Sequence, residues 1–253
     1  MKRESSLPGA LAATLVLLAV WQVTVLATDA PPFILPSPAR VAEALWLNRV
    51  IIAQNAWITL AEVLAGLALG AALGAATAIQ LALSPLARRL MLPALVFSQA
   101  VPVFALAPIL TLWLGYGIAS KVVMTVLIIY FPVTSAFLDG LRRTDPALLD
   151  LSAVMGGSPW RTLWRLRLPS ALPDLASGLR LASVYAPIGA VIGEWVGASK
   201  GLGYLMLLAN GRAKADLMFA ALIVLALGAV SLYAALGLLA RALERWSRSG
   251  RWK

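Results

Sequence analysis

The stretch that decides how this chain folds is residues 142–173, which read RRTDPALLDLSAVMGGSPWRTLWRLRLPSALP. It opens with Thr144-Asp145-Pro146, a helix start signal in which a capping side chain precedes a proline in the first turn. The sequence therefore predicts a helix over 146–155. Gly156-Gly157 ends that helix, because glycine accepts the left-handed backbone conformation that often follows a last helical turn.

A second helix is predicted directly after the glycines, from Pro159 to about Leu168. Ser158 supplies its N-cap, and the proline occupies the first helical position. Pro169 and Pro173 are expected to close the unit, because proline disrupts a helix interior. Residues 142–173 thus form a helix–Gly–helix unit, which we call the elbow.

The elbow carries an apolar face together with several arginines. A solvated loop would not need Leu, Val and Trp at these positions, so the face must be buried against something. Two interpretations remain open on physical grounds alone. The elbow docks a partner protein, or it lies on anionic lipid headgroups.

The rest of the chain has a composition suited to lipid. Of its 253 residues, 61% are hydrophobic and 13% are charged, and the mean hydropathy is +0.86; a soluble domain carries roughly 25% charged residues. A transmembrane helix needs about 20 mainly apolar residues. Six stretches qualify, near Leu7–Ala27, Trp57–Leu83, Leu90–Leu114, Ile118–Leu138, Leu175–Val196 and Leu217–Leu239. The predicted fold class is an all-α membrane protein with six transmembrane helices.

The distribution of charge predicts that both termini lie in the cytoplasm. By the positive-inside rule, this orientation puts 15 Lys and Arg residues in cytoplasmic segments and 6 in external ones. The cytoplasmic set is Lys2, Arg3, Arg88, Arg89, Arg142, Arg143, Arg161, Arg165, Arg167, Arg180, Arg241, Arg245, Arg248, Arg251 and Lys253. The external set is Arg40, Arg49, Lys121, Lys200, Arg212 and Lys214. The elbow then lies in the cytoplasm between spans four and five.

Missing residue types argue against several functions. The chain has no cysteine and no histidine, which removes thiolate nucleophiles and the commonest zinc ligands, so neither a catalytic residue nor a metal site is predicted. It has no phosphate-binding loop ending in Gly-Lys-Ser/Thr, so it is not expected to hydrolyse ATP alone. The net charge of +10 does not indicate nucleic-acid binding, because the basic residues alternate with the apolar runs.

The first external segment has its own pattern. Pro31–Pro36 is predicted to be extended, because proline disfavours helix for itself and for the residue before it. Ser37-Pro38 then starts a short helix at the outer membrane surface. We interpret residues 1–56 as the first span with this external segment, and residues 57–253 as a five-span core.

Candidate path residues lie within the spans. A carboxylate in hydrocarbon is costly, so Glu194 either lines a solute path or pairs at the interface with Lys200 or Lys121. Pro102 and Pro187 are further candidates, because prolines inside spans kink helices and gates use such kinks.

Span two combines an acid with a stripe of glycines. Glu62 lies near its outer end and is expected at the membrane interface. Gly66, Gly70 and Gly74 recur every four residues, which permits close approach of a neighbouring helix.

The elbow resembles the EAA loop of ABC importer permeases, which has an acidic-small-small start, a glycine, and an aliphatic-x-Leu-Pro ending. Asp150-Leu151-Ser152 occupies the start, Gly156 is the glycine, and Leu166-Arg167-Leu168-Pro169 is the ending. Asp and Leu replace the usual Glu and Ala at the start. The resemblance implies that the elbow couples to an ATPase. The coupling residues it suggests are Asp150, Ser152, Gly156, Ser158, Pro159, Trp160 and Pro169.

Other parts of the chain are similar to permeases for nitrate, sulfonates, taurine and thiamine-pyrimidine precursors. The similar stretches are Leu35-Pro36-Ser37-Pro38 and Leu202-Gly203-Tyr204-Leu205, whereas Glu62 replaces a residue that is often basic. Phe104–Pro108 and Gly193–Gly197 look most like the hydroxymethylpyrimidine and thiamine-precursor branch.

What the resemblance implies is an inner-membrane permease subunit that pairs with a second copy, as a homodimer. An ABC ATPase dimer would hold the ATP and Mg, so this chain would need no cofactor. A periplasmic or lipid-anchored binding protein would deliver a hydroxymethylpyrimidine-like solute, or otherwise a sulfonate, taurine or nitrate. The alternative function is an ion-coupled secondary transporter or channel, for which an inverted repeat or mid-membrane ionisable residues would be expected.

Overall fold

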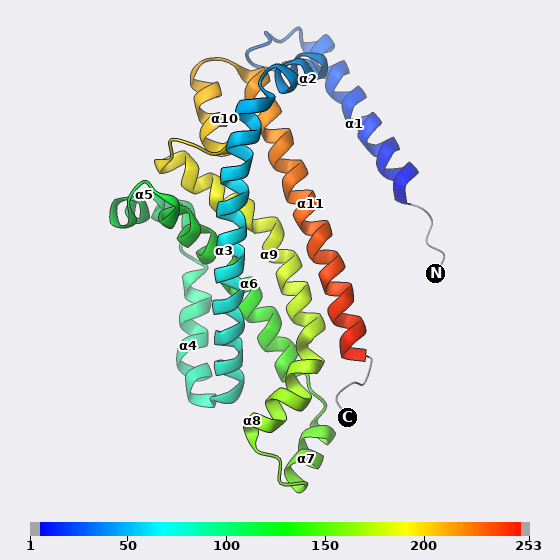
Figure 1. The fold of residues 1–253 in the computed structure, drawn as a ribbon, viewed down its shortest axis with the longest axis vertical. Helices are drawn as coiled ribbons and strands as arrows, with labels where there is room; N and C mark the ends of the chain where they lie inside the picture. The colour runs from blue at the N-terminus through cyan, green and yellow to red at the C-terminus, as the bar shows by residue number, and fades with distance from the viewer. Residues whose placement is uncertain (1–5, 249–253) are drawn as a thin grey trace.

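The computed structural model describes residues 6–248 as a helical bundle without strands in that range (Figure 1). Five helices in this range are long and apolar enough to cross a membrane, and there are six spans if a bent helix pair is counted as one. The five are α1 (Ser6–Thr28), α3 (Arg49–Leu83), α6 (Ile118–Arg142), α9 (Leu168–Gly197) and α11 (Ala215–Arg248). The predicted fold class is confirmed. Of the charges counted for orientation, Lys2, Arg3, Arg251 and Lys253 lie outside the described residues.

Helices α3, α6 and α9 form the centre of the bundle, because glycines let their backbones approach closely. A Cβ at Gly66 of α3 would lie 2.5 Å from the Cβ of Thr125 on α6. Gly70 and Gly74 repeat this contact further along α6, so the predicted close approach is confirmed. Gly189 of α9 reaches Thr125 too, where a Cβ would lie 2.6 Å from its Cα. Thr125 is therefore held between glycines of two neighbouring helices.

The third span is bent. Helices α4 (Pro85–Ser98) and α5 (Val103–Leu114) meet at 97°, so the span predicted over Leu90–Leu114 is sharply bent. Pro102 occupies the N-cap of α5 in an extended conformation, and its missing amide hydrogen cannot continue the helix from α4. In Figure 1, α4 runs beside α3 while α5 turns away from the bundle axis.

The elbow contains α7 (Pro146–Val154) and α8 (Pro159–Thr162), as predicted. The expectation that two prolines close it is wrong, because the chain stays helical from Pro159 to Gly197. Pro169 lies in the first turn of α9, directly after a wider π turn over Leu163–Arg167 that accommodates the missing amide hydrogen. Pro173 is tolerated inside α9, as prolines often are in membrane helices.

The external segment before α3 also differs in part from the prediction. Pro31–Pro36 forms a turn and is not extended, because the Ile34 amide donates to the Pro31 carbonyl at 2.8 Å. Helix α2 (Pro38–Leu47) begins as predicted, with the Ser37 hydroxyl as its cap. It packs against α11, so it belongs to the bundle as well as to the outer surface.

Candidate functional site

The elbow turns on two glycines that its geometry requires for different reasons. Gly156 has φ of +70°, a left-handed conformation that other residues rarely adopt. Its amide donates to the Ala153 carbonyl at 3.0 Å, and the Gly157 amide donates to the Ser152 carbonyl at 2.8 Å, the paired bonds of a Schellman motif. A Cβ on Gly157 would collide with the Ser152 hydroxyl. The sequence pattern predicted a role for Gly156. It did not predict the steric role of Gly157, because that role depends on the folded position of Ser152.

Polar side chains fix the two helices of the elbow. The hydroxyl oxygens of Ser152 and Thr162 lie 2.8 Å apart and join α7 to α8. An Asp145 carboxylate oxygen accepts the Ala147 amide at 2.9 Å and caps α7. The Ser158 hydroxyl caps α8 in the same way, ahead of the proline at its first position. The predicted capping signals are confirmed.

The inner side of the elbow is anchored in the base of the bundle. Leu163 is fully buried in an apolar cluster with residues from α3 and α6. The Arg167 guanidinium donates to the Ala82 carbonyl at the end of α3, at 3.4 Å. The hydroxyls of Thr144 and Ser170 lie 3.1 Å apart. Because α8 also runs into α9, the elbow is joined to the bundle by continuous helix.

The outer side of the elbow is an exposed apolar surface. No residue of α7 is buried, and Val154 and Met155 at the tip are 87% and 77% exposed. A groove of about 280 Å³ lies between the two short helices, and Arg161 and Arg165 are among the residues that line it. Exposed apolar side chains next to basic ones are typical of an interaction surface.

The predicted coupling residues divide into three groups in the structure. Asp150 and Trp160 are exposed on the outer side. Ser152, Gly156, Ser158 and Pro159 hold the turn together. Pro169 is buried in the first turn of α9, away from the exposed surface.

A buried polar cluster lies near the outer end of the bundle. The Glu194 carboxylate, 1% exposed, accepts the Thr59 hydroxyl at 2.6 Å and the Gly203 amide at 2.5 Å. The Asn55 side-chain oxygen accepts the Gly201 amide at 2.7 Å. These groups supply acceptors for the otherwise unpaired first amides of α10 (Leu202–Gly211). Glu194 therefore ties α9 and α10 to α3.

Lys121, one of the two lysines suggested as partners of Glu194, forms an ion pair with Glu62 instead. Lys121 lies 3.9 Å from a Glu62 oxygen and donates to the Gly117 carbonyl at 2.9 Å. Lys200 is exposed in the loop between α9 and α10 and makes no ion pair with any described residue. Of the two alternatives for Glu194, an ion pair with Lys200 or Lys121 is therefore not formed in the described part of the chain.

Glu62 is 2% exposed, so it is buried in the protein and not open to water. Helix α3 begins at Arg49, two turns before the expected start at Trp57, so Glu62 lies more than three turns inside it. One of its carboxylate oxygens has no hydrogen-bond partner among the described residues.

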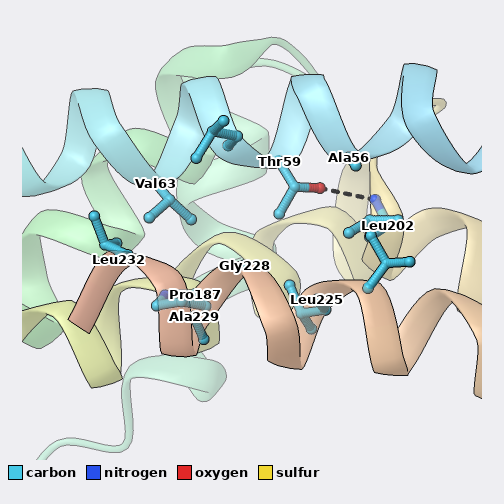
Figure 2. A pocket seen from close by; sticks show the side chains of 11 residues that line it. Ala56, Thr59, Val63, Pro187, Leu202, Leu225, Gly228, Ala229 and Leu232 are labelled. Carbon is cyan, nitrogen blue, oxygen red and sulfur yellow. Dashed lines mark hydrogen bonds between the residues drawn. The ribbon is translucent and has the colours of Figure 1, made fainter. Parts of the chain in front are cut away.

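Pro187 lines an apolar pocket of about 140 Å³ between α3 and α11 (Figure 2). Thr59 lies at the edge of this pocket, where its hydroxyl accepts the Leu202 amide at 2.8 Å. The same hydroxyl bonds Glu194, so the pocket adjoins the polar cluster. Pro102 is far along the chain, at the bend between α4 and α5, and lines neither feature. The three candidate path residues therefore do not form one site.

Comparison with known families decides the class of the protein. Residues 66–249 match the family described as binding-protein-dependent transport system inner membrane component. The chain belongs to this family. It is a multi-pass inner-membrane permease subunit of an ABC importer, a transport component and not an enzyme. Importers of this class work with an ATPase and a substrate-binding protein.

Three relatives cover most of the chain. A probable ABC transporter permease protein of Haemophilus influenzae is 52% identical over 86% of this chain and 89% of its own length. The riboflavin transport system permease protein of Chloroflexus aurantiacus is 38% identical over 93% and 88%. The formylaminopyrimidine transport permease protein of Halalkalibacterium halodurans is 36% identical over 92% and 94%.

The same fold occurs in a chain of the MetNI methionine ABC transporter, solved in inward-facing conformations. The TM-score is 0.69 at 19% sequence identity, and the match covers 78% of this chain and 97% of that one. This likeness supports the architecture described above.

Proposed function

We propose that this permease carries a flat nitrogen heterocycle, with hydroxymethylpyrimidine or another thiamine precursor as the best candidate. The observation that carries the proposal is the pair of relatives named for riboflavin and formylaminopyrimidine, each matched over more than nine-tenths of this chain. Both compounds contain heteroaromatic rings with nitrogen acceptors. The similarity of Phe104–Pro108 and Gly193–Gly197 to the thiamine-precursor branch favours the pyrimidine.

Calorimetry on the cognate binding protein, together with uptake by the reconstituted importer, tests this solute class. Hydroxymethylpyrimidine, riboflavin, taurine and nitrate are titrated separately. We expect the pyrimidine to bind most tightly and to enter proteoliposomes only when ATP is supplied to the ATPase side. Binding and uptake of taurine or nitrate, with no response to the pyrimidine, would reject the proposal.

The elbow is proposed as the docking site of the ATPase. Its outer side is apolar and exposed, while its inner side is anchored to α3, α6 and α9. In Figure 1, α7 and α8 project beyond the ends of α3 and α4, away from the body of the bundle. That position favours a protein partner over lipid headgroups.

In the proposed cycle, two copies of this chain pair, and an ATPase dimer that holds the ATP and Mg binds beneath the two elbows. Closure of the ATPases displaces the elbows. The displacement reaches α9 without an intervening loop, because the chain is helical from Pro159 to Gly197. Tilting of α9 against α3 and α6 then changes access to the path between the two copies.

Co-purification tests the docking surface. A tagged chain should bring down its ATPase from detergent-solubilised membranes. Replacing Val154 with Glu puts a charge on the apolar tip and should lower the recovered ATPase at least tenfold. Phe33→Glu, which changes an exposed apolar residue on the external side, is the matched control and should leave recovery unchanged. Equal recovery from both variants would reject this surface.

A further inference from the structure

Arg180 lies within α9, inside the stretch Leu175–Val196 predicted as a span, although it was counted among the cytoplasmic charges. Gly178, half a turn before it, packs against α6, where a Cβ would lie 2.9 Å from the Ala136 Cβ and 3.3 Å from the Pro132 carbonyl oxygen. Ala136 and Pro132 precede Arg142, the cytoplasmic end of α6, by six and ten residues, or about 9 to 15 Å of helix. A guanidinium at that depth is costly unless it faces a partner or water. The orientation bias survives this correction, because the other cytoplasmic charges remain in the majority.

The partner of Arg180 is neutral. Its Nη2 donates to the Tyr233 hydroxyl of α11 at 2.6 Å, and its guanidinium carbon lies 4.9 Å from the centre of the Tyr233 ring. No carboxylate in the part of the chain that the structure describes forms an ion pair with it. Its Nε is buried without a hydrogen-bond partner in the same part. Arginine has five N–H donors, so this cation keeps donors available for another molecule.

Arg180 lines a groove of about 290 Å³ beside Ser177 and Tyr233. A second groove of about 550 Å³ shares Ala136 and Leu181 with the first, so the two grooves are adjacent on α6 and α9. The second groove adds polar or aromatic side chains, which are Gln99, Phe131, Ser135, Asp139 and Tyr185. Lipid-exposed helix surfaces do not carry this many polar groups, because each costs free energy in hydrocarbon. The two grooves together, which we call the band, are therefore expected to face water.

We propose that Arg180 contacts the solute in a water-lined path along this band, donating hydrogen bonds to ring-nitrogen or carbonyl acceptors of a flat heteroaromatic molecule. The rings of Phe131 and Tyr185 offer stacking faces for such a molecule along the same band. The chemical class rests on the proposed function, whereas the presence of water in the path does not.

Cysteine accessibility tests the path, and the chain is suited to it because it has no native cysteine. Ser177→Cys probes the groove, and Leu73→Cys is a control at the same depth, since the neighbouring Gly178 and Gly74 both pack against Val133. Leu73 is exposed on α3. In the complete importer, a membrane-impermeant methanethiosulfonate should modify position 177 and not position 73. Reaction of position 177 with a lipid-soluble maleimide alone would mean a lipid-facing groove, and reaction with neither reagent would mean a groove closed by the second copy. Either result overturns the path.

Solute protection tests the role of Arg180. Hydroxymethylpyrimidine delivered by the binding protein should slow modification of Ser177→Cys, and Arg180→Gln should remove that protection. The same variant should lower uptake per ATP hydrolysed at least tenfold, with Arg180→Lys intermediate because it keeps the charge and loses the planar fork. ATPase activity stimulated by the binding protein should remain, which a merely structural role would not predict. Arg241→Gln, an exposed arginine on α11, is the control.

The outcomes separate this inference from the proposed function. Failure of the wild-type importer to take up the pyrimidine would reject the solute class and leave the accessibility result standing. Normal uptake and protection in Arg180→Gln, in an importer that carries the pyrimidine, would overturn the role of Arg180 alone.

Discussion

The hydroxyl oxygens of Ser152 and Thr162 lie 2.8 Å apart on opposite sides of the elbow turn, where Gly156 has φ of +70°. This contact sets the angle between α7 and α8. The angle in turn fixes how the exposed tip is presented and how it is joined to α9. The coupling role proposed for the elbow therefore depends on a few short contacts that can be removed one at a time.

Ser152→Ala should weaken coupling without unfolding the chain. A hydrogen bond of this kind contributes about 0.5–1.5 kcal/mol, so we expect uptake to fall roughly two- to tenfold as the elbow samples other angles. ATP-driven uptake by reconstituted importer is the measurement. Thr24→Ala on α1 is the control, because its hydroxyl bonds only within its own helix. Wild-type uptake by Ser152→Ala would show that the contact is dispensable.

Gly156→Val should abolish ATP-driven uptake while the chain still inserts into the membrane. A β-branched residue is strained at this positive φ, although space is available, since no atom lies within 4 Å of a Cβ there. Gly156→Asn should retain much of the activity, because asparagine tolerates the left-handed conformation. Uptake is compared with the amount of inserted chain. Normal uptake by the valine variant would contradict the elbow assignment.

Glu194→Gln should destabilise the importer without changing its solute preference. The Thr59 hydroxyl and the Gly203 amide both donate to this carboxylate. A glutamine amide has a single acceptor oxygen, so one donor loses its partner at a cost of about 1–3 kcal/mol. The thermal unfolding midpoint in detergent should fall, whereas uptake per ATP hydrolysed should not. An unchanged midpoint with lost uptake would favour direct solute contact by Glu194.

Gly189→Ala should be more destabilising than Gly228→Ala. A Cβ at Gly189 would meet the Thr125 backbone, which cannot move aside, and overpacking of this kind costs about 1–3 kcal/mol. Gly228 has no atom within 4 Å of a Cβ, so alanine there should be neutral or slightly stabilising. Thermal unfolding of the two variants in the same detergent makes the comparison, and equal midpoints would contradict the described packing of α3, α6 and α9.

Features set by local sequence were predictable. Ser37, Asp145 and Ser158 cap helices that begin at the prolines after them, because a cap depends only on neighbouring residues. The spans follow from hydropathy for a similar reason. Gly156 was identifiable because a helix stop needs a residue that tolerates positive φ.

Features set by tertiary contacts were not predictable in the same way. The constraint on Gly157 depends on where the folded turn places the Ser152 hydroxyl, and Glu62 is buried beside Lys121 of α6. Arg180 was assigned to the cytoplasm because charge counting does not show how far a side chain lies along a span. The 97° bend at Pro102 was foreseeable as a kink, but its size depends on the packing of α4 and α5.

The most direct test of the central claim is photocrosslinking from the tip of the elbow. Val154→Cys, labelled with a benzophenone maleimide in the otherwise cysteine-free chain, is irradiated in the assembled importer. Phe33→Cys on the external side serves as the control. Docking of the ATPase at the elbow predicts a crosslink to the ATPase from position 154 and none from position 33. An importer that retains its ATPase yet yields crosslinks from position 154 only to lipid would contradict the account.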